Sequence, residues 1–379
     1  FHAQVLAAGR TVYVDPYAAG DTTHYISYDK QGLRLNGRQF ECLVDDTKSQ
    51  LDPEVENAAN DKLQSFSNGG TLRTYRLALA CTGEYATAVC GHNGVSVTVA
   101  NTFAAMTTTM NRVDGVYERE VSIRMVLVAN DTSIVYTNSS TDPYTNNNAN
   151  SLLTQNQSTC DSVIGSANYD IGHVFSTGGG GVAGLGVVCR SNQKARGVTG
   201  LPQPVGDPFD IDYVAHEMGH QFGAPHSFMG TASACSGNAS GADAYEPGSG
   251  STIMAYAGIC GSDNLQSNSD AYFHHSSIQR IQTYVAGSGN CSTNTGTTNN
   301  TPILSAGPNL TIPANTPFAL SPASFSDPDS DPLTFTWEPR DAAVRALPTA
   351  DPGTGSIFRP RMPAAATTQY FPPLDDVID

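Results

Sequence analysis

The chain has 379 residues, of which 39% are hydrophobic and 14% charged, and its formal net charge is −16. This length is sufficient for two or three domains with a substantial core. The acidic excess disfavours nucleic acid or an anionic membrane as the main partner, because both carry negative charge. No apolar run approaches the roughly 18 to 20 residues that a membrane-spanning helix needs.

Residues 1–46 are predicted to form a small β-rich unit, with strands at residues 11–14 and 24–28. Residues 47–70 are polar, contain Pro53 and end in Asn-Gly-Gly, which is typical of an exposed connector that proteases can cut. The chain begins at Phe1 without a signal segment, so we expect a processed or excised form.

Residues 71–291 read as an α/β (α+β) domain, because strands alternate with long helices. We expect strands at residues 74–80, 121–128 and 171–175, a long helix over residues 95–113 and a weaker one over 151–164. Residues 178–181 read as a flexible glycine turn, because they lack the Lys-Ser/Thr of a phosphate-binding loop. Residues 182–188 are glycine-broken and predict an edge strand.

A further helix is predicted to start with Asp207 as its N-cap and Pro208 as its first residue, and to continue to Phe222. A last helix is expected over residues 273–285. Residues 292–302 are rich in Ser, Thr, Asn and Gly and predict a flexible linker. Residues 303–379 are predicted to form a β-rich accessory module. The sequence leaves open whether this module is complete.

The segment from His216 to His226 carries the strongest functional signal. His216 and His220 are four residues apart, so both lie on one face of a helix and can bind one Zn²⁺. Gly223 can adopt a positive φ and turn the chain so that His226 becomes a third ligand. A bare His-Glu-x-x-His pattern occurs by chance, but Gly223 and His226 at fixed offsets make coincidence improbable.

Three histidine ligands leave the fourth zinc position for water, which is the arrangement of a catalytic site. Zinc lowers the pKa of that water and polarises a scissile carbonyl. Glu217, next to the first ligand, is then expected to act as the general base and afterwards to protonate the leaving amine.

The same segment resembles the metzincin zinc metallopeptidases. Residues 251–256 look like the Met-turn of that family, in which Met254 would form an apolar floor beneath the three histidines. Residues 169–175 and 184–189 look like the approach to the active helix in the reprolysin (adamalysin) branch, of the bacterial secreted type. The resemblance covers residues 71–291 and implies a catalytic domain with a twisted mixed sheet above a smaller, irregular lower subdomain.

Several site residues are implied by this resemblance. The edge strand, with Gly184, Leu185, Gly186 and Val187, would pair with extended substrate. Residues 257–266 would line the pocket for the side chain after the scissile bond. Cys189 would pair with Cys291, and Cys235 with Cys260.

Two departures from the reprolysin pattern bear on the branch. Reprolysins usually have Asp at the position of Ser227, so this position is more like that of matrixins. Tyr256 looks like the tyrosine of astacins and serralysins. We expect Tyr256 to stabilise the oxyanion of the reaction; the alternative is a packing role.

Eight cysteines, none in Cys-x-x-Cys spacing, predict disulfides and therefore an oxidising, extracellular location; buried free thiols are the alternative. If residues 1–46 are the remnant of an inhibitory prodomain, Cys42 is a candidate to cap the zinc as a thiolate, as in a zymogen. Cysteine parity argues for a disulfide at Cys42 instead, because seven others would leave one unpaired.

Three aspartates in the C-terminal region, Asp327, Asp329 and Asp331, resemble the calcium-associated loops of immunoglobulin-like bacterial modules. The resemblance implies an immunoglobulin-like module over residues 303–379 and Ca²⁺ bound by these carboxylates, although a solvated acidic turn explains them equally well. His173, His274 and His275 have no partner spacing and read as structural.

The sequence therefore predicts a secreted, monomeric, zinc-dependent endopeptidase that cuts extended protein or peptide substrates. The alternatives are a zinc amidase and an adhesion or binding protein with a silent protease domain.

Overall fold

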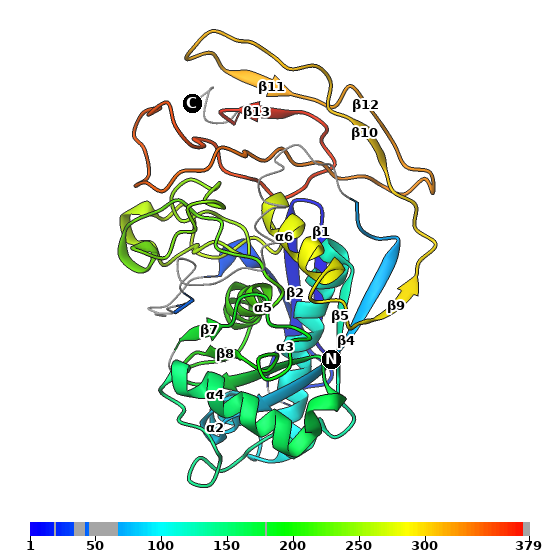
Figure 1. Ribbon diagram of the computed structural model, residues 1–379, viewed down its shortest axis with the longest axis vertical. Helices are drawn as coiled ribbons and strands as arrows, with labels where there is room; N and C mark the ends of the chain where they lie inside the picture. Colours follow the sequence, from blue (N-terminus) through cyan, green and yellow to red (C-terminus); the bar gives the residue numbers. More distant parts are fainter. Residues whose placement is uncertain (19, 34–41, 45–66, 179, 374–379) are drawn as a thin grey trace.

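The computed structural model describes residues 1–18, 20–33, 42–44, 67–178 and 180–373 (Figure 1). Most of the predicted connector, residues 47–66, lies outside these residues. No helix in the described part of the chain is long and apolar enough to cross a membrane.

The N-terminal unit is an antiparallel sheet of three strands followed by a short helical turn. Its elements are β1 (Ala3–Ala7), β2 (Arg10–Pro16), β3 (Tyr25–Asp29) and η1 (Lys30–Gly32). Both predicted strands of this unit are confirmed. β1 packs against α3 (Val99–Val121), where Gln4 and Leu6 lie beside Gly115.

The central domain has a mixed sheet with the strand order β5-β4-β6-β8-β7. These strands are β4 (Thr71–Cys81), β5 (Ile123–Leu127), β6 (Ile171–Ser176), β7 (Gly181–Ala183) and β8 (Gly197–Gly200). β4, β5, β6 and β8 run parallel, whereas β7 is antiparallel to β8 and forms one edge. The predicted α/β domain with a mixed sheet is therefore confirmed.

Helices pack against this sheet and enclose the largest core of the molecule. They are α2 (Gly83–His92), α3, α4 (Ala149–Thr159) and α6 (His275–Ala286). Shorter helical segments follow or connect them: η2 (Asp131–Ile134), η3 (Cys160–Gly165), η4 (Ser166–Asn168), η6 (Ser233–Cys235) and η7 (Gly261–Asp263). The sequence analysis did not find α2, and the helix predicted over residues 95–113 begins four residues before α3 begins and ends eight residues before α3 ends.

The segment after the central domain is only partly a connector. Within the predicted linker, β9 (Thr293–Gly296) pairs antiparallel with the first residues of β4. The chain then forms two separate two-stranded sheets, one from β10 (Ile303–Ser305) and β12 (Ser324–Ser326), the other from β11 (Phe318–Leu320) and β13 (Gln369–Phe371).

The predicted immunoglobulin-like module is not confirmed. In the described residues after 302, regular structure is limited to these two small sheets and one isolated bridge between Phe335 and Ala364. Part of this backbone bonds to the central domain instead: the amide of Ala343 donates to Ala244 O at 3.0 Å, and that of Arg345 to Met229 O at 2.9 Å. Figure 1 shows β10–β13 at the end of the molecule opposite α2 and α4.

Candidate active site

The helix that carries the first two predicted ligands lies in the centre of the molecule. It begins at Pro208, as predicted, with η5 (Pro208–Ala215), and continues without a break into α5 (His216–Gln221). All fourteen of these residues are buried. Asp207 does not act as the predicted N-cap; its carboxylate instead accepts hydrogen bonds from Lys30 and Tyr13 of the N-terminal unit.

The end of this helix brings the third histidine back. Gly223 has a φ of +91°, a conformation that strains residues with a side chain, and the chain reverses there as predicted. The turn places Ala224 O at 2.7 Å from Nδ1 of His220. It also places Nε2 of His226 at 3.1 Å from Nε2 of His220, which lies 3.1 Å from Nε2 of His216.

The hydrogen bonds of the three rings determine where their lone pairs point. Nδ1 of each ring bonds a backbone carbonyl: Ile253 O for His216 at 2.7 Å, Ala224 O for His220 at 2.7 Å, and Asn238 O for His226 at 2.8 Å. A carbonyl only accepts, so each neutral ring carries its proton on Nδ1 and presents an unprotonated Nε2. Burial, and then the neighbouring His226, lower the pKa of His216 to about 3, which keeps that ring neutral.

Three converging lone pairs with no proton between them repel one another unless a cation lies among them. Tetrahedral zinc with nitrogen bonds of about 2.0 to 2.1 Å separates its nitrogen ligands by about 3.3 Å, close to the two separations found here. The residues present therefore fit a zinc ion, and the carbonyls that bond Nδ1 would hold each ring in the ligand orientation.

Two further groups face this histidine cluster. Cys42 Sγ lies 3.7 Å from Nε2 of His220, and the thiol and the three imidazoles together form a group able to hold a metal ion. Glu217, which is fully buried, lies beside the thiol. Burial, and next the charge of Glu217, raise the pKa of Cys42, so a thiolate at this position requires an adjacent cation.

Tyr256 lies over two of the histidine rings. Its ring centroid is 4.7 Å from that of His226 and 5.7 Å from that of His216, and its hydroxyl donates to Cys42 O at 3.2 Å. The hydroxyl is therefore directed to the same side of the histidines as the thiol and is placed to donate to an oxygen there.

Met254 lies beneath the helix and is completely buried. A Cβ atom at Gly219 would stand 2.4 Å from Met254 Sδ, so only glycine fits at this point of α5. The same turn supplies Ile253 O to His216, and its Met254 O accepts from the amide of Ser227 at 3.1 Å. The helix and the Met254 turn are thus joined through backbone atoms.

Glu246, which the sequence analysis did not identify, fixes this turn. Its buried carboxylate accepts from the Ser227 hydroxyl at 2.6 Å, from the Ser251 amide at 2.7 Å and from the Thr252 amide at 3.1 Å. Reprolysins usually have an Asp directly after the third histidine. Here Ser227 occupies that position, and the carboxylate comes from Glu246, which accepts a hydrogen bond from the Ser227 hydroxyl. The sequence analysis missed Glu246 because it lies outside the His216–His226 segment in the sequence.

The predicted edge strand is wrong for Gly184, Leu185, Gly186 and Val187. β7 ends at Ala183, and Gly186 has a φ of +61°. The amides of Gly186 and Val187 donate to His220 O and Gln221 O, both at 2.9 Å. These donors satisfy the C-terminal carbonyls of α5 and are therefore not available to a substrate strand.

The edge that remains is β7, and residues around Cys42 already lie against it. Cys42 and Gly181 form a parallel bridge, and the amide of Leu43 donates to Gly181 O at 2.8 Å.

The cysteines follow both readings of the sequence. The disulfides Cys189–Cys291 and Cys235–Cys260 form as expected, with Cα separations of 5.8 and 5.2 Å. The other four cysteines, Cys42, Cys81, Cys90 and Cys160, are buried free thiols. The parity argument for a disulfide at Cys42 is therefore wrong, because three other thiols are also unpaired.

His173 and the acidic turn are explained without a further metal. His173 is buried between Gln221 Oε1 at 2.8 Å and Thr199 Oγ1 at 2.9 Å, which is a structural role. Asp327, Asp329 and Asp331 lie close together, but Asp329 accepts from Asn300 and Asp327 from the amides of its own turn. These contacts are those of an acidic turn and give no support to the predicted calcium.

The sequence profile described as "Metallo-peptidase family M12B Reprolysin-like" matches residues 71–284, which is more than half of the chain. Among solved structures, metalloproteinase-II from Bacteroides fragilis is similar at 11% identity and a TM-score of 0.36, over 75% of this chain and 78% of that chain. A TM-score this low adds nothing to the assignment. No curated protein matches.

Proposed function

Because the chain belongs to the reprolysin-like M12B metallopeptidases, a metzincin family, we propose that it is a zinc endopeptidase that cuts extended protein segments. The observation that carries this proposal is the convergence of the three Nε2 atoms of His216, His220 and His226, with Glu217 beside them. Protein or peptide substrates follow from the family; the internal cleavage site and the roles of single residues are proposed.

The three histidines would hold the zinc ion. When bound, zinc polarises the scissile carbonyl and makes an attacking water more acidic. Glu217 takes a proton from that water and returns it to the leaving amine. Tyr256 donates its hydroxyl proton in a hydrogen bond to the oxygen that becomes negatively charged.

We further propose that residues 1–46 keep this chain latent. Cys42 Sγ approaches the fourth side of the histidine cluster, where a tetrahedral sulfur ligand would lie about 3.6 Å from each nitrogen. The observed 3.7 Å to His220 Nε2 agrees with that separation. Residues 42 and 43 also occupy the edge of β7, which is the sheet edge nearest this thiol. An extended substrate would need the same edge and the same side of the histidines.

Export from the cell is part of this proposal. The two disulfides favour an oxidising compartment. A latent form that is activated later by a cut would protect the cell's own proteins until the protease has left the cell.

The test is hydrolysis of fluorescent casein by the full chain, before and after cleavage in residues 45–66, with the zinc content of each sample measured. Glu217→Ala is the control variant, because it removes the base and leaves the three histidines. We expect one zinc per chain in both proteins and activity only in the wild type. Zinc without hydrolysis in every form would refute the protease proposal.

Latency is tested separately with Cys42→Ser in the uncut chain. If the thiol blocks the site, this variant should hydrolyse casein roughly 10-fold or more faster than uncut wild type, because a hydroxyl binds zinc far less tightly than a thiolate. Cys90→Ser is the matched control, since Cys90 is also a buried free thiol but belongs to α2. Equal, low activity of both variants would show that Cys42 is not the block.

A further inference from the structure

A narrow cavity of about 10 Å³ lies beside the first zinc-ligand candidate, His216. Its walls include Tyr256, Ala257 and Ile259, from the stretch expected to line the pocket for the side chain that follows the scissile bond. A substrate side chain that enters here therefore comes from the residue next to the bond being cut. The residues that line the cavity then decide which side chains are accepted.

Asp212 is one of the residues that line this cavity. It precedes His216 by four residues and so lies one turn earlier on the same face of the helix. Its side chain is only 4% exposed. Oδ1 accepts from Lys30 Nζ and from the Ser269 amide, both at 3.1 Å. Oδ2 is buried and has no hydrogen-bond partner in the described part of the chain. A buried carboxylate oxygen without a partner favours a cationic donor.

In this structure the cation is supplied by the N-terminal unit. Lys30 is only 4% exposed, and its ammonium group bonds Asp207 at 2.7 Å as well as Asp212. Asp210, on the same helix, is paired with Arg112 of α3 at 2.7 Å and does not depend on the N-terminal unit for its cation. Lys30 is therefore the cation whose removal would leave Asp207 and Asp212 uncompensated.

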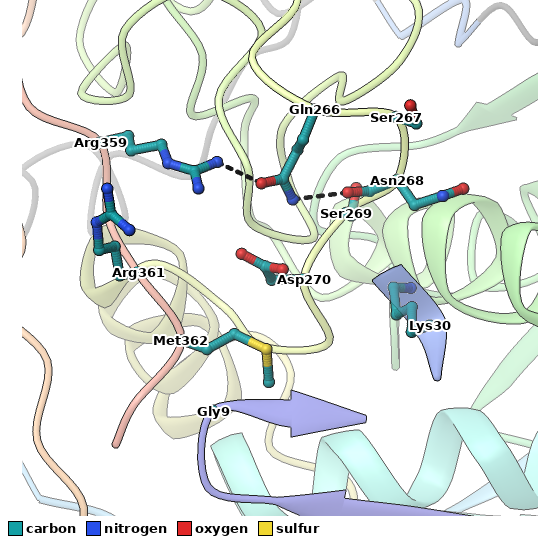
Figure 2. Close-up of a pocket in the computed structure, with 10 residues that line it drawn as sticks. All are labelled: Gly9, Lys30, Gln266, Ser267, Asn268, Ser269, Asp270, Arg359, Arg361 and Met362. Atoms are coloured by element: carbon teal, nitrogen blue, oxygen red, sulfur yellow. Dashed lines mark hydrogen bonds between the residues drawn. The ribbon is translucent and has the colours of Figure 1, made fainter. Parts of the chain in front are cut away.

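The narrow cavity adjoins a larger one of about 570 Å³. Ser269 lines both cavities, Asp212 lines the smaller, and Lys30, which bonds Asp212, lines the larger. Figure 2 shows Lys30 on one side of the larger cavity, Arg359–Met362 on the other, and the loop Gln266–Asp270 between them. Departure of the N-terminal unit would remove Lys30 and free the space beside Asp212. A long side chain that enters beside His216 would then reach this carboxylate.

Burial raises the pKa of Asp212 to about 7, although Lys30 acts in the opposite direction. Without Lys30, this carboxylate needs another cation to stay ionised. A lysine or arginine side chain supplies one, since its aliphatic part can pass Ala257 and Ile259 while its charged end reaches the acid.

We propose that, once residues 1–46 are cut from the catalytic domain, Asp212 selects substrates with lysine or arginine directly after the scissile bond. The charged end of that side chain would occupy the position that the Lys30 ammonium group occupies before the cut. This inference rests on the proposed peptidase function and assigns its substrate class. Asp212 is then the residue that determines specificity. Before the cut, Lys30 of the same chain neutralises its charge.

The test uses the full chain cut in residues 45–66, with both fragments left in the assay, and peptides that differ only at the residue after the scissile bond: Lys, Arg, Met, Leu or Glu. We expect kcat/KM to be at least about 10-fold higher for Lys and Arg than for Met, the apolar side chain of similar length. Asp212→Asn should abolish this preference and still cut the Met peptide. Asp210→Asn is the matched control and should keep the preference, because Asp210 does not line the cavity.

Affinity is measured in parallel with Glu217→Gln in the cut chain, by fluorescence anisotropy of the labelled Lys and Met peptides. Tighter binding of the Lys peptide, lost on adding Asp212→Asn, supports the inference even if no form of the chain cuts peptides. Cutting of Met and Leu peptides as fast as Lys peptides would overturn the inference and leave the peptidase function standing. Equal binding of the two peptides, or a Lys preference that survives Asp212→Asn, would also overturn it.

Discussion

At the scale of single residues, the chemistry depends on side chains whose hydrogen bonds leave them one possible role. Each zinc-ligand candidate gives its Nδ1 proton to a carbonyl, so its Nε2 can only accept. Tyr256 is held against His226 by ring contact, and its hydroxyl points to Cys42 O, an oxygen on the side where substrate would lie. The hydroxyl therefore already donates to a carbonyl oxygen at the site.

This arrangement makes a prediction for Tyr256→Phe in the cut chain. If the hydroxyl stabilises the developing oxyanion, the change should lower kcat roughly 10²-fold with little effect on KM, because the interaction is made mainly in the transition state. Steady-state hydrolysis of one peptide measures both constants. Tyr245→Phe is a control, since Tyr245 is also buried but stacks on His274. A kcat near that of the wild type would mean that Tyr256 only packs.

At the scale of elements, the site is made where α5 and the Met254 turn join. Gly219 allows the turn to approach the helix, and Glu246 holds the turn through Ser227, Ser251 and Thr252. Because Ile253 O orients the His216 ring, movement of the turn would disturb a zinc ligand directly. Glu246 touches none of the three histidines in the hydrogen bonds described above, so its effect on zinc passes through this turn.

We therefore predict that Glu246→Gln weakens zinc binding roughly 10- to 100-fold, the range expected for a group that supports a ligand. The amide cannot accept the same set of hydrogen bonds, so the turn loosens. Zinc titration against a competing chelator measures the affinity. Glu118→Gln, at a partly exposed ion pair with Arg124, is the control and should leave zinc affinity unchanged. Unchanged affinity in Glu246→Gln would show that the turn is held by other contacts.

At the scale of the whole molecule, the two ends of the chain are bound to the catalytic domain by buried polar contacts. The N-terminal unit contributes Lys30, and Asp15 pairs with Arg112 at 2.6 Å. The C-terminal region contributes Glu338, whose carboxylate accepts from the amide of His275 at the start of α6, at 2.6 Å. These are contacts between parts of the chain that sequence analysis treats as separate domains.

Glu338 makes the C-terminal contact dependent on pH. Burial raises its pKa to about 8; Glu246 and Glu120 act in the same direction, while the His275 amide and Arg340 oppose them. A carboxyl with a raised pKa in the folded state stabilises the fold below its ordinary pKa, and that contribution is lost as pH rises through about 8.

We therefore predict that the Tm of the wild type falls between pH 5 and pH 8, and that Glu338→Gln removes part of this fall, because glutamine stays neutral. Each kcal/mol of stability corresponds to roughly 2 to 4 °C in a domain of this size. Thermal unfolding at several pH values, with zinc held constant, measures the effect. The same slope in both proteins would exclude Glu338 as its source.

The sequence by itself determined the zinc ligands, the base and the methionine turn as candidates. Their spacing is local: residues four apart share a helix face, and Gly223 lets the chain turn back within a few residues. Several strands and helices of the central domain were also predictable from apolar periodicity within short windows, but α2 and β8 were not predicted. Both disulfide pairs followed from the family resemblance.

The tertiary structure alone decided which distant residues complete the site. Cys42 lies 178 residues from His220, and Lys30 lies 182 from Asp212. The substrate edge at β7, the unpaired state of Cys42 and the support from Glu246 also depend on how separate segments pack. Local periodicity carries no record of such pairings, because they are determined by the burial of charge and apolar surface across the whole fold.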